Sequence, residues 1–417
     1  MRQTFLHGGS SFSGSSGGKR SEIIWTGRNM SSGDDVPYAP VPSSGTLNKF
    51  RIETSEPVTQ ELDFSLIKNQ VDSAPNVTIL NGGTVGESDD GTSVNAGDII
   101  SAKGESAFGY SGSFIMSWSI RFTPSNTTKA IAMGCIPTSS IFVVTPSTTR
   151  EYTHIIGYGI SFDTTESTRY YYCPMSGTIE NLYIMLERTF TGTATFVFSI
   201  FKNGSEEVSS QVTIDDTHTL RQVHSVTGLS IAFASGDTLT LSGIRTAGTF
   251  GWDQVGSGTL SWGFQYTPTI QGESMVGGCT NQNLSTVQNT IQHGFLNRSN
   301  TNGPNIGFTT DESKVKALIG EKVIIKNFRV NLSDAPGANQ SREFRLRKNS
   351  GNGNALITIS DSSTSGSSNN TDSCIMSDLV NISTKPTTAS CAATKVFWSA
   401  IMKVNQNEIL ARPMYFK

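Results

Sequence analysis

Strand-length segments in which apolar and polar residues alternate recur along the whole chain. One of them reads SWSIRFTP, and its apolar residues Trp118, Ile120 and Phe122 share one face of an extended strand. This period of two is typical of a strand with one buried face. About seven or eight such segments occur in every ~140 residues, separated by turns rich in Gly, Asn, Asp and Ser. The pattern predicts an all-β fold of antiparallel strands.

Helical periodicity is scarce by comparison. The best candidate is the segment 310–319, TDESKVKALI, which opens with a capping pattern. We expect a short helix there and strands almost everywhere else.

Five short signatures recur along the chain in one fixed order. They are an opening turn and strand (44–52, 176–184 and 319–330), an apolar strand ending in Lys-Asn (64–69, 198–203 and 344–349), a β-branched triplet (77–79, 212–214 and 357–359), a Gly-Asp turn (96–99 and 235–239) and a closing strand with Trp (117–124, 261–268 and 397–402). Ordered signatures at similar offsets indicate an internal repeat rather than chance triplets. The sequence therefore predicts three tandem antiparallel β-sandwich domains of the jelly-roll-like kind.

The three copies are unequal. The third has no Gly-Asp dipeptide at the expected turn and no closing Pro, so we interpret it as a diverged terminal copy. A Gly-Cys pair, at 134–135 and 278–279, follows the closing strand of the first two copies. The predicted organisation is a flexible Gly/Ser-rich arm at 1–20 and repeats at 21–130, 131–272 and 273–417.

Composition and charge narrow the class of partner. Charged residues make up 16% of the chain and the formal net charge is −3, so we expect no direct nucleic-acid partner. No stretch approaches the ~18 apolar residues of a membrane-spanning helix, so we expect no membrane span. The first residues lack the apolar core of a secretory signal, and we expect no export by a cleaved signal.

The cysteines allow two interpretations. There are five, an odd number, and their spacings fit no zinc motif. Cys374 and Cys391 could form a disulfide within one domain, whereas the simpler interpretation is buried thiols that act as small apolar side chains.

No motif predicts a catalytic residue, a cofactor or a metal site. His218 and His224 flank a loop next to acidic residues, but their spacing is not that of a metal site, and a solvated loop is the favoured interpretation. The acidic loop with Glu87, Asp89 and Asp90 fits no EF-hand register, so we interpret it as a turn. We expect a protein that is not an enzyme. Carboxylates of a glycan-degrading enzyme meet only in the folded chain, and that class remains a third alternative.

The most aromatic run is Tyr170-Tyr171-Tyr172. Exposed tyrosines can stack on sugars, so Tyr170 and Tyr171 are the candidates for contact with a glycan or a partner. The alternative is a strand in which one or two of the three rings are buried.

The repeat resembles the β-sandwich modules found repeatedly in virion structural proteins of bacteriophages and other DNA viruses. The second copy carries the resemblance in Ser176-Gly177-Thr178, Asn181-Leu182, 198–204, Gly236-Asp237 and 262–268. The resemblance covers most of residues 40–405 and is weakest in the third copy. It implies an architecture and a virion context, and it implies no catalytic residue.

Our first functional hypothesis is therefore a virion structural protein, such as a capsid, head-decoration, fibre or spike component. It would assemble in the host cytoplasm as a homo-oligomer and with other virion proteins. The alternative is a carbohydrate-binding or adhesive array on a fibre or cell surface, with a host-surface glycan as its ligand.

Overall fold

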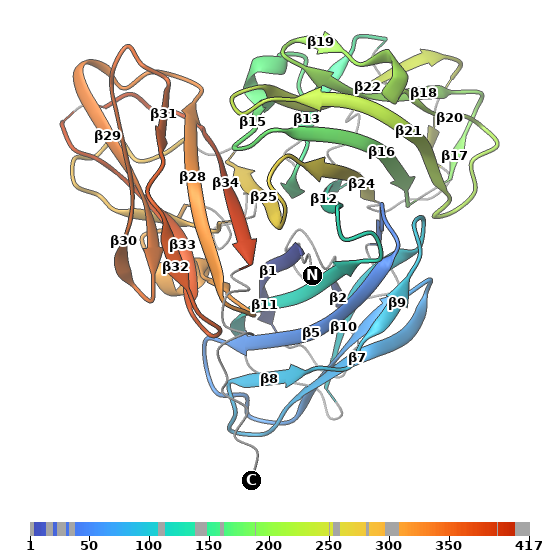
Figure 1. Cartoon of the computed structure of the whole chain (residues 1–417), viewed down its shortest axis with the longest axis horizontal. Coiled ribbons are helices and arrows are strands. Elements are labelled where there is room, and N and C mark those ends of the chain that lie inside the picture. Colours follow the sequence, from blue (N-terminus) through green and yellow to red (C-terminus); the bar gives the residue numbers. More distant parts are fainter. Residues whose placement is uncertain are drawn as a thin grey trace.

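A computed structural model of the chain has three β-sandwiches gathered around a common centre (Figure 1). It describes residues 4–13, 20–22, 31–32, 38–106, 113–137, 148–158, 162–187, 189–249, 251–252, 259–280, 283–296, 308–389 and 391–404. In these residues the regular structure is almost entirely strand, and the pairing is antiparallel except between β12 and β14. The predicted all-β class with tandem antiparallel sandwiches is confirmed.

Unit 1 contains the first eleven strands. They are β1 (Thr4–Ser13), β2 (Arg20–Glu22), β3 (Ser31–Ser32), β4 (Ala39–Pro40), β5 (Gly45–Thr54), β6 (Leu62–Lys68), β7 (Val71–Ile79), β8 (Val85–Ser88), β9 (Thr92–Val94), β10 (Ile99–Ser106) and β11 (Ser113–Pro124). One sheet has the order β1-β11-β5-β8, with β9 beside β5. The other has the order β3-β2-β10-β6-β7, with β4 beside β10.

Unit 2 repeats this plan. Its strands are β12 (Ala130–Pro137), β13 (Glu151–His154), β14 (Gly157–Tyr158), β15 (Tyr171–Tyr172), β16 (Gly177–Leu186), β17 (Phe190–Thr191), β18 (Thr195–Lys202), β19 (Ser205–Glu206), β20 (Val212–Ile214), β21 (Val223–Phe233), β22 (Thr238–Ala247), β23 (Gly251–Trp252) and β24 (Thr259–Pro268), with short 3-10 helices η2 (Glu166–Arg169) and η3 (Val208–Ser210). One sheet has the order β14-β12-β24-β16-β21 and faces a second, in which β13, β22 and β18 are neighbours. Strands β17 and β23 form a small separate ladder.

Unit 3 completes the series. Its elements are β25 (Glu273–Cys279), β26 (Gln292–Gly294), η4 (Glu312–Val315), β27 (Ala317–Leu318), β28 (Val323–Leu332), β29 (Gly337–Lys348), β30 (Gly351–Asp361), β31 (Ser365–Ser368), β32 (Asp372–Cys374), β33 (Leu379–Pro386) and β34 (Val396–Val404). The sheets have the orders β25-β34-β28-β31 and β26-β33-β29-β30. The sequence pattern predicted the strand faces correctly, since Phe344 and Leu346 lie in the core of this unit.

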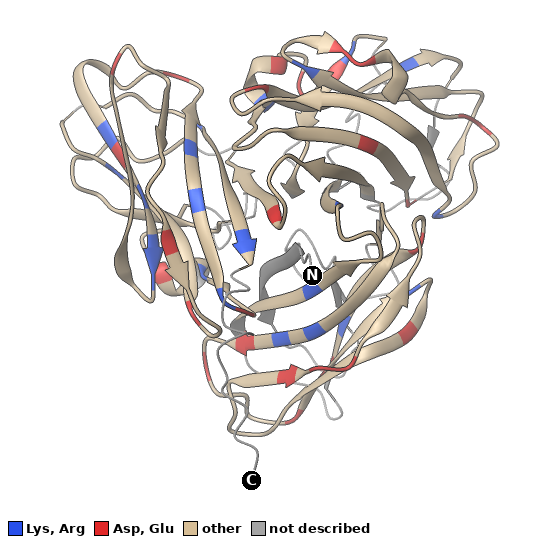
Figure 2. Ribbon diagram, in the orientation of Figure 1, with Lys and Arg blue, Asp and Glu red and all other residues tan. Residues whose placement is uncertain are grey.

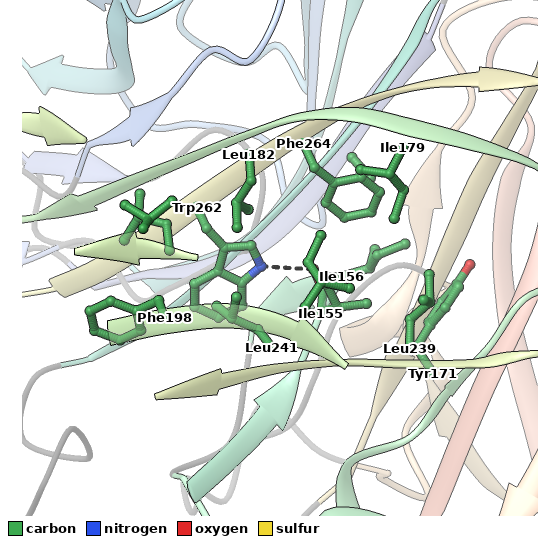
Figure 3. Packing of buried hydrophobic residues seen from close by; sticks show 14 of the residues in the cluster. Ile155, Ile156, Tyr171, Ile179, Leu182, Phe198, Leu239, Leu241, Trp262 and Phe264 are labelled. Atoms are coloured by element: carbon green, nitrogen blue, oxygen red, sulfur yellow. Dashed lines mark hydrogen bonds between the residues drawn. The ribbon is translucent and has the colours of Figure 1, made fainter. Parts of the chain in front are cut away.

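Each unit opens with a strand that pairs with its own closing strand. A glycine of the opening strand lies opposite the closing tryptophan in the pairs Gly8–Trp118, Gly134–Trp262 and Gly278–Trp398. A Cβ atom on Gly134 would lie 2.6 Å from atoms of the Trp262 ring, so the ring can pack here only against glycine. The Trp262 Nε1 donates a hydrogen bond of 2.7 Å to the carbonyl O of Ile155 (Figure 3).

The opening strand of unit 1 lies in the range predicted to be a flexible arm. Residues Thr4–Ser13 form β1, which pairs with β11 over its whole length. Within the predicted arm, these residues therefore form an edge strand, on the side of β11 that β5 leaves free. Strands β12 and β25 begin at Ala130 and Glu273, next to the predicted boundaries.

The Lys-Asn and Gly-Asp signatures form one device in the folded chain. In unit 2, Asn203 follows β18 with a φ of 51°, and its side chain donates to Asp237 Oδ1 at 2.9 Å and accepts from Thr238 N at 2.8 Å. Asp237 Oδ2 in turn accepts from Ala234 N at 2.8 Å. This Asn–Asp bracket ties the end of β18 to the turn that begins β22.

The same Asn–Asp bracket occurs in the other two units. Asn69 with Asp98 forms it in unit 1, at 2.8 Å. In unit 3, Asn349 donates to Asp378 at 2.6 Å, so the turn that the sequence suggested was degenerate keeps its aspartate. Ser377 stands where the other copies have Gly97 and Gly236, and it keeps their left-handed backbone, with a φ of 76°. The third copy thus lacks the Gly-Asp dipeptide but keeps the turn, because the turn needs the aspartate and the backbone shape rather than glycine itself.

The helix expected at 310–319 is much shorter than predicted. It is a single 3-10 turn, η4, in which the Asp311 side chain accepts a hydrogen bond of 3.1 Å from Ser313 N. The capping pattern was thus recognised correctly. The chain then continues directly into β27, because Ala317 and Leu318 pair with β33 instead of extending a helix.

All five cysteines are free and buried. No disulfide joins Cys374 and Cys391, so the simpler of the two interpretations, buried thiols, is confirmed.

Candidate functional site: a centre shared by three sandwiches

Strand β12, the first strand of unit 2, supplies side chains to two cores at once. Alternate residues of a strand point to opposite faces. From β12, Ala130, Ala132 and Ile136 join the core of unit 2, and Ile131, Met133 and Cys135 join the core of unit 1. The Gly-Cys pair follows the closing strands of units 1 and 2 because it belongs to the first strand of the next unit. Gly134 lies opposite Trp262 in the sheet, and Cys135 packs in the core of the preceding unit.

Strand β25 has the same role between units 2 and 3. Met275 packs in the core of unit 2, while Val276 packs in the core of unit 3. Strands β12 and β25 are also in contact with each other, and both lie near the middle of the molecule (Figure 1).

Units 1 and 2 meet through an apolar cluster. Tyr38, Ile67 and Ile99 from unit 1 pack with Met185 of unit 2. The guanidinium of Arg221 lies 4.8 Å from the centre of the Tyr38 ring, a cation–π contact across the boundary. Burial raises the pKa of Tyr38, and Arg221 opposes that rise.

Units 2 and 3 meet through aromatic side chains. The Tyr171 hydroxyl donates to the carbonyl O of Val276 at 3.2 Å. The His154 ring stacks on Phe397 of unit 3, with ring centroids 6.1 Å apart. Burial lowers the pKa of His154 to about 4, so the ring is neutral at physiological pH and packs like an apolar group.

Units 3 and 1 meet mainly through polar contacts. The Ser117 hydroxyl donates to the carbonyl O of Lys316 at 2.5 Å. Glu321 of unit 3 accepts from Arg121 of unit 1 at 2.7 Å and also pairs with Lys49. This closing seam therefore depends on partly buried charges, whereas the other two boundaries combine apolar or aromatic packing with hydrogen bonds, such as that from the Ser399 hydroxyl to the carbonyl O of Tyr172.

The three boundaries use equivalent elements. Strand β4 of unit 1 contacts β24 of unit 2, β15 of unit 2 contacts β34 of unit 3, and β27 of unit 3 contacts β11 of unit 1. In each case the short strand before the opening turn of one unit lies against the closing strand of the next. Contacts of this head-to-tail kind close into a ring when the rotation between units is right, and here the third contact returns to unit 1.

The tyrosines singled out in the sequence do not form an exposed platform. Tyr171 is fully buried in the core of unit 2, so its prediction as a sugar-stacking side chain is wrong. The cause is its place in β15, where it points between the two sheets and toward unit 3. Tyr170 is partly exposed and contacts Tyr172 edge to face, with centroids 6.0 Å apart; a glycan contact there stays a prediction.

The histidine and acidic loops have structural partners. His218 Nδ1 lies 3.0 Å from His224 Nε2, and His218 Nε2 lies 3.1 Å from the carbonyl O of Leu186. Glu87 accepts from Arg51 at 2.6 Å. Among the described residues, no three His, Cys, Asp or Glu side chains come close enough together to hold a metal ion.

Charged residues of both signs are scattered along the strands and loops in Figure 2 and are few compared with the other residues. Within the described part of the chain, no helix is both long and apolar enough to cross a membrane.

Sequence reasoning missed the residues that join the units. Tyr38 and Arg221 stand outside every recurring signature, and Glu321 lies within one (319–330) without being one of its recurring residues. A polar residue at a boundary looks like any surface residue in the sequence. The one available signal was the Gly-Cys pair, which was noticed as following the closing strand and which the predicted boundaries place at the start of the next unit.

Comparison of the chain with known protein families and with curated proteins finds no match.

Proposed function

We propose that this protein is a structural component of a virus particle, where it assembles with further copies of itself and with other particle proteins. The observation that supports this most is the head-to-tail ring of three equivalent sandwiches, in which β12 and β25 each supply side chains to two cores. Shared cores make the three units one stiff body, and an assembly protein needs a stiff body with a large outer surface. Under this proposal the protein is located in the virion after assembly in the host cytoplasm.

The surface chemistry supports the same role. Only 16% of residues are charged, and Ser, Thr, Asn and Gly dominate the turns. Weakly charged, hydrogen-bonding faces can pack against copies of themselves without strong repulsion.

The second candidate is a carbohydrate-binding or adhesive protein on a fibre or an extracellular surface. A specific observation favours it: unit 3 has a pocket on the outer face of β29, and its lining includes Arg345 and Arg347. No observation in the described residues favours the third class, a glycan-degrading enzyme.

The particle role is tested by isolating particles from the host in which the chain is made. Particles are banded in a density gradient, washed in high salt, and digested for peptide mass spectrometry. We expect peptides from all three units at a fixed ratio to the major particle protein. Recovery of the chain only from the soluble fraction, as a monomer that no particle retains, would contradict the proposal.

A further inference from the structure

The outer face of one strand distinguishes unit 3 from the other two units. Strands β6, β18 and β29 end in the same Lys-Asn pair, so their residues correspond one to one. The two core positions are apolar in all three units. The first is occupied by Phe64, Phe198 and Phe344, and the second by Leu66, Ile200 and Leu346. The two outward positions change in character. The first is occupied by Ser65, Ser199 and Arg345 in units 1, 2 and 3, and the second by Ile67, Phe201 and Arg347. The divergence of unit 3 therefore falls on positions that the core does not require.

In units 1 and 2 this outer face is covered. Ile67 is 4% exposed and lies in the apolar cluster between units 1 and 2. Phe201 is 7% exposed beneath Arg150, whose guanidinium lies 5.0 Å from the ring centre. Arg150 also donates to Ser199 at 3.1 Å and to Glu206 at 2.9 Å, so its charge is neutralised.

In unit 3 the same face is open and forms a pocket of about 120 Å³. Its lining includes Ile291, Glu343, Arg345, Arg347, Asn352 and Lys385. Strand β29 supplies both arginines, and their spacing of two residues places them on one face. Opposite Arg345, Ser383 of β33 adds a hydroxyl to the wall.

Among the residues that the structure describes, one cation of this pocket has no carboxylate partner. Arg347 is held by Glu312 through two hydrogen bonds of 2.7 and 3.1 Å. The Lys385 Nζ lies 3.4 Å from Glu343 Oε2, so these two side chains form an ion pair. Arg345 has only a contact of 3.5 Å to the carbonyl O of Gly353, which is long for a hydrogen bond. Its guanidinium is therefore the group in the pocket that is ready to bind an anion.

The chemistry of these groups specifies a class of ligand. A guanidinium binds a planar carboxylate through two parallel hydrogen bonds. Ser383 can bond to hydroxyl groups beside that carboxylate, and Ile291, which is 45% exposed, offers an apolar wall to a ring. We infer that this pocket binds the carboxylate of a single acidic sugar residue, with Arg345 as the anchoring side chain. This inference does not rest on the particle role, because it concerns one face of unit 3.

The test is calorimetric titration of the full chain with the methyl glycoside of glucuronic acid. The neutral methyl glucoside and sodium acetate are titrated in parallel, so that the ring and the carboxylate are tested separately. We expect saturable binding of the glucuronide, clearly weaker binding of acetate, and none of the glucoside. The affinity should fall as salt rises, since one charge pair anchors the ligand.

Variants of one residue complete the test. Arg345→Gln should weaken glucuronide binding at least about tenfold. Arg345→Lys should bind with intermediate affinity, because lysine keeps the positive charge but lacks the two parallel N–H donors of the guanidinium. Arg245→Gln, on the outer part of unit 2, is the matched control and should bind like the unchanged chain. Thermal unfolding of each variant checks that it folds. The inference is overturned if Arg345→Gln binds as well as the control, or if the glucoside or acetate binds as tightly as the glucuronide.

Discussion

At the scale of single residues, the Asn–Asp bracket explains why Lys-Asn recurs at the end of one strand and an aspartate recurs before another. Asn203 adopts a left-handed backbone that asparagine tolerates better than most residues, and both of its amide atoms are used. The lysine takes part as well, because Lys202 Nζ donates to the carbonyl O of Ala232 at 2.9 Å.

Replacing this asparagine tests the bracket. Asn203→Ala should destabilise unit 2 by about 1–2 kcal/mol, because two hydrogen bonds are lost and alanine resists a positive φ. Thermal unfolding followed by tryptophan fluorescence measures the change. Asn203→Gly is the matched control, since it loses the same bonds without the backbone strain, and it should be less harmful. Equal stability of Asn203→Ala and the unchanged chain would rule out a stabilising role.

The difference caused by Asn203→Ala should also depend on pH. The Ala234 N–H and the Asn203 side chain lower the pKa of Asp237, so the folded state favours its carboxylate. A carboxyl group with a lowered pKa stabilises the fold above its unfolded pKa, and this stabilisation is lost as pH falls through the folded pKa. The gap between Asn203→Ala and the unchanged chain should therefore narrow in acid.

Much of the residue-scale picture followed from the sequence, because alternation reports which face of a strand is buried. Trp118, Ile120 and Phe122 were placed on one buried face by that pattern alone, and all three are buried. The hydrogen bond between Asn349 and Asp378 was not predicted, because a contact between residues 29 positions apart leaves no local signal in a single sequence. The buried Tyr171 was missed for the same reason, since its covering strands come from elsewhere in the chain.

At the scale of elements, the opening strands determine how the units are joined. Strand β12 pairs with β24 on one side, while alternate side chains pack in the cores of units 1 and 2. A strand placed in this way links two units more firmly than a flexible connection would.

The close approach of Gly134 and Trp262 tests this joint. Gly134→Ala would place a methyl group where the Trp262 ring now lies, and it should cost about 1–3 kcal/mol, measured as a lower unfolding midpoint. The same change in a Trp262→Phe background should cost less, because the smaller ring leaves room. An equal loss in both backgrounds would show that the clash is not the cause.

The sequence pattern predicted strands here but not which sheet each strand joins. Gly134 and Cys135 were recognised as a recurring pair that trails the closing strand. Which sheet a strand joins is decided by partners far along the chain, and the register of β12 on β24 is of that kind. The N-terminal β1 was missed because its Gly- and Ser-rich sequence resembles a linker.

At the scale of the whole molecule, the chain builds from one polypeptide the kind of ring that three separate subunits would otherwise form. Two boundaries are covalently continuous and include buried apolar or aromatic contacts, and the third includes the ion pairs of Glu321 with Arg121 and Lys49. The repeat predicted three units, but periodicity does not distinguish a row from a ring. That choice depends on side chains at the boundaries, such as Tyr38 and Glu321, which are not among the recurring residues of any signature.

Closure of the three units into one ring is tested most directly by small-angle X-ray scattering of the full chain at low salt. A compact or ring-like chain of 417 residues should have a radius of gyration of about 22–26 Å. Three sandwiches in a row would give a larger value, on the order of 30 Å or more, with an elongated distance distribution. A value in the compact range, with a single-peaked distribution, is the expected result. An elongated particle of the larger size would contradict the ring.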